Sequence, residues 1–141
     1  MNRITLEQAN RIVIGAFQKG AELKLKPLSV AVLDAGGHLI AFQRQDGASI
    51  MRFQIASGKA SGALALGVSS RKIGEMAAER ASFVASLGPI APHGVIPAAG
   101  GVIVVGDGDI LGAVGVTGDS SDNDEISALA GVTAAGLKAQ G

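Results

Sequence analysis

The chain contains no cysteine, tryptophan or tyrosine, and each absence removes a class of site or of core packing. Without cysteine there is no disulfide framework, no thiolate catalysis, no haem thiolate ligand and no cysteine-based zinc or iron–sulfur centre. Only four phenylalanines occur, although 48% of the 141 residues are hydrophobic. The core must therefore be built from Ala, Val, Ile and Leu.

The chain also lacks a net charge and a long hydrophobic run. Twelve basic residues balance twelve acidic ones, so no overall field would steer the protein toward nucleic acid or an anionic membrane. No segment approaches the ~18 apolar residues that a membrane span needs, and the first residues do not resemble a signal peptide. We expect a cytoplasmic protein that binds a small molecule, with neither nucleic acid nor a membrane as partner.

Glycine, in contrast, is abundant: 21 residues, several of them inside segments that otherwise have helical patterns. Each glycine in a helix costs about 0.5–1 kcal/mol relative to alanine, so close backbone contact is the expected compensation. Contact between subunits would provide it, and we expect a homo-oligomer. The alternative is that the helices pack closely within one chain.

The pattern of apolar residues predicts helices alternating with β-hairpins in a single domain, residues 1–141. Helices are expected at 5–24, 49–66, 70–87 and from 122 through 137, and Thr5 and Gln8 have the spacing of a capping box at the start of the first. Strands are expected at 28–33, 38–43, 102–105 and 110–116, with a short edge strand near Val95 and Ile96. The last two long strands are almost entirely apolar, which indicates central strands covered on both faces. Hairpins in place of crossover helices favour an α+β fold with an antiparallel sheet flanked by helices.

Two histidines are candidates for a metal, haem iron or acid–base chemistry near neutral pH. His38 opens a strand beside a glycine-rich turn, where an ordinary hydrogen-bonded or exposed residue is expected. His93 lies in the segment Gly88–Gly101, which contains three prolines and reads as a structured loop. Because functional groups concentrate in such loops, His93 is the favoured candidate.

Charged side chains interrupt apolar segments at a strand end, within a glycine-rich helix and at the start of the last helix. They are Arg44, Asp46, Lys59, Asp124 and Glu125. Arg44 and Lys59, together with backbone N–H groups near Gly100 and Gly101, would suit an anionic ligand with carboxylates. The alternative is that Lys59 is solvated and that Arg44 and Asp46 form a weak surface ion pair.

One long segment, residues 30–48 with the sequence VAVLDAGGHLIAFQRQDGA, resembles the signature hairpin of GlcG/HbpS-like proteins, a family that includes the C-terminal domain of PduO. Further similarity lies in ASGKA at 56–60, the Gly100–Gly101 step, ILGAVGVTG at 110–118, and Asp124–Glu125 leading into residues 128–131. The resemblance spans essentially the whole chain. It implies a profilin-like three-layer sandwich with a five-stranded antiparallel sheet and assembly into homo-oligomers. Some family members bind or sense haem.

These observations lead to two functional hypotheses. The first is a haem-binding or haem-responsive accessory protein, with His93 or His38 near the iron and Arg44 or Lys59 pairing with the propionates. The second is a small isomerase, tautomerase or lyase in which Arg44 and Lys59 bind a carboxylic acid while Asp46, Asp124, Glu125 or His93 moves a proton. In either case the site is expected at a subunit boundary, formed by the Gly88–Gly101 loop, the Arg44–Asp46 strand end and the Asp124–Glu125 helix start. Gly62 is expected on the helix face packed there.

Overall fold

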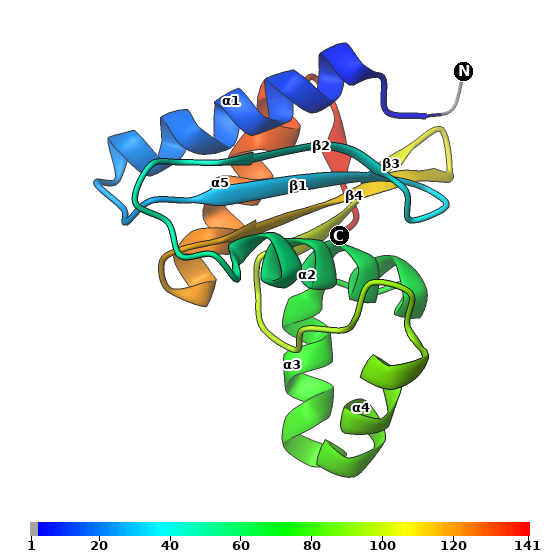
Figure 1. The fold of residues 1–141 in the computed structure, drawn as a ribbon. Coiled ribbons are helices and arrows are strands. Elements are labelled where there is room, and N and C mark those ends of the chain that lie inside the picture. Colours follow the sequence, from blue (N-terminus) through cyan, green and yellow to red (C-terminus); the bar gives the residue numbers. More distant parts are fainter. Residues whose placement is uncertain (1–2) are drawn as a thin grey trace.

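A five-stranded antiparallel sheet forms the middle layer of the computed structural model, which describes residues 3–141 (Figure 1). Its strands are β1 (Ser29–Asp34), β2 (Leu39–Arg44), β3 (Gly101–Gly106), β4 (Asp109–Thr117) and β5 (Lys138–Ala139). The spatial order is β2-β1-β4-β3-β5, so the apolar strand β4 lies at the centre as expected. Helices cover both faces, and the predicted α+β three-layer architecture is confirmed.

Helices α1 (Leu6–Glu22) and α5 (Ser121–Ala134) form one outer layer. The predicted capping box starts α1: the Thr5 side chain accepts from the Gln8 N–H while the Gln8 side chain accepts from the Thr5 N–H. Between this layer and the sheet lies the larger apolar core, which includes Ile12 and Val13 of α1 and Val132 of α5.

Helix α2 (Arg52–Leu66) lies against the opposite face of the sheet. Glycines in the strands make this approach close: a Cβ on Gly115 would lie 1.9 Å from the Ala56 carbonyl oxygen, and one on Gly101 would lie 2.3 Å from that of Lys59. All eight residues from 56 to 63 are buried, because the loop before β3 crosses the other side of the helix. Small residues in α2 therefore fit a helix covered on two sides.

The helix predicted over 70–87 is two helices. Helix α3 (Ser70–Glu79) ends at Arg80, whose backbone is far from helical at φ −135° and ψ 58°, and α4 (Ala81–Leu87) runs from there into a short 3₁₀ turn, η1 (Gly88–Ile90). The two helices project from the body as an arm (Figure 1). Only Ser70 and Ile73 of α3 and Val84 of α4 are buried, so the apolar periodicity carries little information about the break.

The expected edge strand at Val95 and Ile96 is also wrong, since neither residue belongs to a strand. The fifth strand is β5 at the C-terminal end, which pairs with Val104 and Val105. The last helix consequently ends at Ala134 and does not continue through Leu137, and its N-cap is Ser120, which accepts from the Asn123 N–H. Within residues 3–141, no helix combines the length and the apolar character needed to cross a membrane.

Glycines inside the helices contact other parts of the same chain. A Cβ on Gly15 of α1 would lie 2.6 Å from the Ala134 Cβ, and one on Gly131 of α5 would lie 2.4 Å from the Ile12 carbonyl oxygen. Gly62, expected at a subunit boundary, faces Val95 of its own chain, and an added Cβ would lie 3.2 Å from the Val95 Cα. Close packing within one chain therefore accounts for these positions.

Candidate functional site

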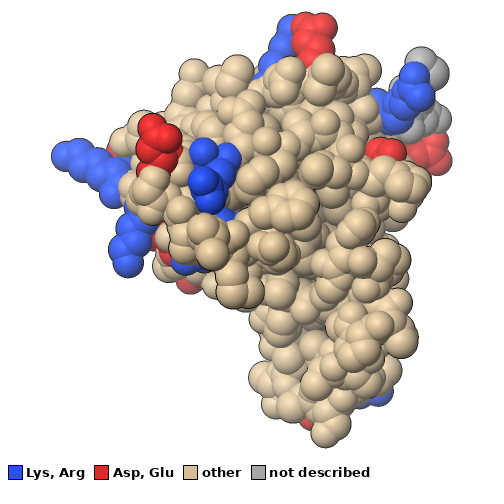
Figure 2. Space-filling view, in the orientation of Figure 1, with Lys and Arg blue, Asp and Glu red and all other residues tan. Residues whose placement is uncertain are grey.

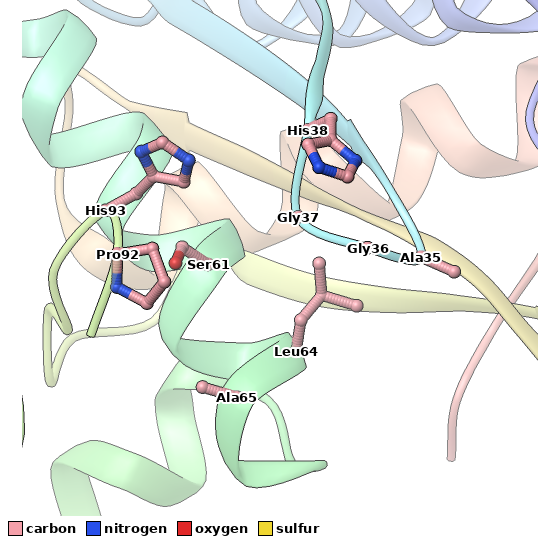
Figure 3. A pocket seen from close by; sticks show the side chains of 9 residues that line it. All are labelled: Ala35, Gly36, Gly37, His38, Ser61, Leu64, Ala65, Pro92 and His93. Carbon is pink, nitrogen blue, oxygen red and sulfur yellow. The ribbon is translucent and has the colours of Figure 1, made fainter. Parts of the chain in front are cut away.

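A pocket of about 340 Å³ lies between the β1–β2 turn, the C-terminal half of α2 and the loop that follows η1. Both histidines of the chain line it, one from each loop, although they are distant in sequence. Figure 3 shows the two imidazoles on opposite sides of the pocket, with Ser61, Leu64 and Ala65 of α2 between and below them. The structure thus brings together the two residues that the sequence offered as iron or proton-transfer groups.

The β1–β2 turn holds His38 through the side chain of Asp34. One carboxylate oxygen of Asp34, Oδ1, accepts the N–H groups of Gly36 and His38, both at 2.9 Å, and lies 3.2 Å from the His38 Nδ1. The turn needs a positive φ at Gly37, which is 84° there and explains the glycine. Burial raises the pKa of Asp34, but the hydrogen bonds and the nearby imidazole outweigh it, so the pKa lies below its ordinary value.

The other side of the pocket is the loop that carries His93. This loop lies directly on α2: a Cβ on Gly58 would meet the Ile96 side chain at 2.6 Å and the His93 carbonyl oxygen at 3.5 Å. Glycine at 58 and 62 therefore sets how closely the loop approaches the helix. Among the described residues, no hydrogen bond or ion pair involves the His93 imidazole, whose residue is exposed.

The pocket combines two imidazoles with an apolar floor. Leu64, Ala65 and Pro92 supply apolar surface, and the Ser61 hydroxyl is the remaining polar side chain, on a residue only 5% exposed. Within residues 3–141, no Lys, Arg, Asp or Glu lines the pocket. Such a set can donate imidazole nitrogen to a metal or exchange protons, but it offers no cation to a carboxylate.

Lys59 occupies a different place from the one expected of a ligand-binding residue. Its side chain is 3% exposed, and Nζ donates to Oδ2 of Asp124 at 3.1 Å and to the Val116 carbonyl oxygen at 3.0 Å. Burial lowers the pKa of Lys59 and raises that of Asp124, while their mutual attraction opposes both changes. Gly100 and Gly101 pack against Lys59 as well, so this group of predicted site residues joins α2 to the start of α5.

The remaining charged candidates lie elsewhere. Arg44 and Asp46 border a separate, shallow depression of about 530 Å³ near the start of β1. Glu125 accepts from Arg71 of α3 at 3.1 Å. Within this one chain, Arg44, Lys59 and Glu125 are therefore not gathered around one ligand. The site expected at a subunit boundary, from the Gly88–Gly101 loop, the Arg44–Asp46 strand end and the Asp124–Glu125 helix start, stays a prediction.

Sequence reasoning missed three residues, two of them at the pocket and one near Lys59. Asp34 was not among the expected site residues, although a carboxylate four positions before a histidine across a Gly-Gly turn is a usable signal. Ser61 gave no signal, because its place depends on the loop that crosses α2. Arg52 was also missed; it spans from α2 to the Thr117 hydroxyl at 2.8 Å.

Comparison with known proteins agrees with the fold. Residues 4–133 match the family described as haem degrading protein HbpS-like. Protein GlcG of Escherichia coli K12 is 37% identical over 116 residues, which cover 81% of each chain. The crystal structure of HbpS has a TM-score of 0.80 at 29% identity, covering 93% of this chain and 89% of that one. The crystal structure of a PduOC:heme complex, at 19% identity, has the same fold, with a TM-score of 0.87 and 99% coverage of both chains. The chain therefore belongs to the HbpS-like family.

Proposed function

We propose that this protein binds haem in the pocket between His38 and His93. The observation that carries the proposal is that the only two histidines of the sequence, from distant loops, line the same pocket. The family description refers to haem degradation, and a relative in fold was crystallised as a heme complex. These names describe the relatives, and they support a haem-related ligand for this chain.

The residues present fit the chemistry of haem. An imidazole nitrogen is a common axial ligand of haem iron, and apolar side chains such as Leu64 and Pro92 suit the face of a macrocycle. The pocket volume of about 340 Å³ is at the lower end of the range for small-molecule pockets, roughly 300–1,000 Å³, so the pocket would hold one edge of the macrocycle and leave the rest outside it. The lining offers no cation to the propionates, and Lys59 already pairs with Asp124. Affinity must then come from the imidazoles and the apolar floor.

The two histidines would have different roles in this pocket. His38 stands on a short turn between paired strands and is restrained by Asp34, so it can hold the iron in a defined place. Among the described residues His93 has no such restraint, so its imidazole can turn toward a ligand or away from it. Bound haem would supply an iron centre capable of electron transfer and ligand exchange.

Titration of the purified protein with haemin tests the proposal. The wild type is expected to give a saturable Soret shift. His38→Ala and His93→Ala should each weaken binding by about tenfold or more, and the double variant should give no specific shift. Gln54→Ala, an exposed change on α2 that does not line the pocket, is the matched control and should bind like the wild type.

Two results would refute haem binding at this place. One is a wild-type spectrum that stays that of free haemin at stoichiometric protein. The other is a double histidine variant that binds haemin as tightly as the Gln54→Ala control. A panel of organic acids screened by thermal shift in the same buffer examines the isomerase or lyase hypothesis, whose expected cationic residues are separated in this chain.

A further inference from the structure

The hydrogen bonds around Asp34 determine which nitrogen of His38 is left for a ligand. Oδ1 of Asp34 already accepts two backbone N–H groups, each at 2.9 Å, when the His38 Nδ1 approaches it to 3.2 Å. An ionised carboxylate has only acceptors, so the Nδ1 of the imidazole must carry a proton to bond with it. In the neutral ring the lone pair is then on Nε2.

Hydrogen bonds from the backbone hold the Asp34 carboxylate in place before the His38 imidazole pairs with it. The side chain of Asp34 is 37% exposed and that of His38 is 80% exposed, and a pair this exposed would contribute little if both side chains had to be ordered. Here the Gly36 and His38 N–H groups hold the carboxylate in advance. Only the imidazole loses rotational freedom when the pair forms, so the cost in side-chain entropy is smaller than for a pair in which both side chains must be ordered.

We infer that Asp34 is a positioning residue that fixes His38 in the Nδ1–H tautomer and leaves Nε2 as the nitrogen that coordinates the ligand. The inference rests on the proposed function for what is bound, but not for the tautomer. Residues in this position commonly orient a metal-binding histidine and increase its basicity. His93, which lacks such a partner among the described residues, is then the weaker of the two ligands.

The tautomer can be measured without any haem. Long-range ¹H–¹⁵N correlation spectra of the ¹⁵N-labelled protein, above the pH at which the imidazoles are protonated, report which nitrogen carries the hydrogen. The spectrum of His93→Ala assigns the signals of His38. We expect His38 mainly as the Nδ1–H form in the wild type, and a shift toward the Nε2–H form in Asp34→Ala. A wild-type His38 mainly in the Nε2–H form would overturn the inference.

Haemin titration tests how the Asp34 charge affects haem affinity and reduction potential. Asp34→Asn keeps an acceptor for the two backbone N–H groups but removes the charge, so the turn should persist. We expect weaker haemin binding, by about tenfold or more, and a higher reduction potential, because a less basic imidazole stabilises ferric iron less well. Asp107→Asn, in the exposed β3–β4 turn, is the matched control and should leave both unchanged.

The outcomes separate the two proposals. If the wild type binds no haemin, the proposed function fails, while the apo spectra still decide the role of Asp34. If the wild type binds haemin but Asp34→Asn matches the Asp107→Asn control in affinity, spectrum and potential, Asp34 does not act through His38. Loss of folding in Asp34→Asn would change its far-UV circular dichroism spectrum. The NMR measurement of the His38 tautomer in the wild type would then decide the role of Asp34.

Discussion

At the scale of single residues, Lys59 has the least ordinary surroundings for its type. An amine that is 3% exposed keeps its charge only because Asp124, at 3.1 Å, is buried with it. Removing one partner of such a pair leaves the other charge buried without compensation, which typically costs about 3–5 kcal/mol. We expect Lys59→Met to lower the free energy of unfolding by this amount in urea titrations, and Lys72→Met, at an exposed position of α3, to change it little.

The coupling between the two charges sharpens this prediction. If the cost of Lys59→Met comes from the stranded carboxylate, the double variant Lys59→Met/Asp124→Asn should lose clearly less than the sum of the single variants. Additive losses would contradict the explanation. A Lys59→Met protein as stable as the Lys72→Met control would contradict it more directly.

The surroundings of Asp119 lead to a second prediction, which concerns how the free energy of unfolding changes at acid pH. Hydrogen bonds from the Asn123 side chain and from the N–H groups of Lys26 and Ser120 lower its pKa from 3.8 to about 2. A carboxyl with a lowered pKa in the folded state adds stability above its unfolded pKa, and loses it as the pH falls toward the folded value. Between about pH 4 and pH 2, Asp119→Asn should therefore lose less stability than the wild type does.

Urea titrations at several pH values across this window measure the effect. The exposed Asp107 is a suitable control, because Asp107→Asn should keep the acid dependence of the wild type. Equal acid dependence in Asp119→Asn and the wild type would mean that the hydrogen bonds around Asp119 do not persist in solution.

At the scale of elements, the packing of α1 on α5 depends on Gly131. An added Cβ would lie 2.4 Å from the Ile12 carbonyl oxygen, which belongs to a rigid helix and cannot move aside easily. We expect Gly131→Ala to lower the free energy of unfolding by about 1–3 kcal/mol, as measured by chemical denaturation. Ala would otherwise favour the helix, so a neutral result would show that the two helices can separate without cost.

Gly88 provides the comparison. Nothing lies within 4 Å of an added Cβ there, but the helical φ of −53° and ψ of −51° come directly before Pro89, where a residue with a Cβ is disfavoured. Gly88→Ala should therefore cost less than Gly131→Ala, because only this local backbone preference opposes the gain from restricting the unfolded chain. The opposite order of the two variants would contradict the explanation by close packing.

The elements most easily predicted were those with a strong local signal. The Thr5–Gln8 capping box, both hairpins and the end of α2 at Gly67 follow from residue type and spacing. The break at Arg80 could not be predicted, because a helix with few buried residues shows the same pattern whether it is continuous or interrupted. Strand β5 has only two residues and exists because β3 offers a free edge.

At the scale of the whole molecule, the candidate site could be predicted only in part. The histidines are conspicuous in a chain that has just two, but their meeting depends on the loop crossing α2, a tertiary contact without local signal. Lys59 and Asp124 were expected to bind a ligand, and in the structure they pair with each other, because the sequence cannot distinguish a charge that awaits a ligand from one that another element already neutralises.

The predicted homo-oligomer stays a prediction at this scale, because the helix glycines that suggested it contact their own chain. The surface gives a different reason to expect it: Figure 2 shows a face whose charged side chains lie mainly at its margins. Large apolar residues are also exposed, including Ile50 at 83% and Ile90 at 79%. Exposed apolar surface is often covered by another molecule. Light scattering should give a mass above that of one chain, and a monomer would contradict the prediction.

The two sides of the pocket belong to parts of the fold that are expected to differ in their free energy of local unfolding. His38 stands between two paired strands, whereas the His93 loop continues from an arm that buries few side chains. A ligand that contacts both His38 and His93 connects the sheet to the loop that follows the arm. Its binding free energy is then added to the free energy needed to detach the arm. A ligand in the pocket should therefore slow local unfolding of the arm, helices α3 and α4. The rate of that unfolding would then indicate whether the ligand is bound.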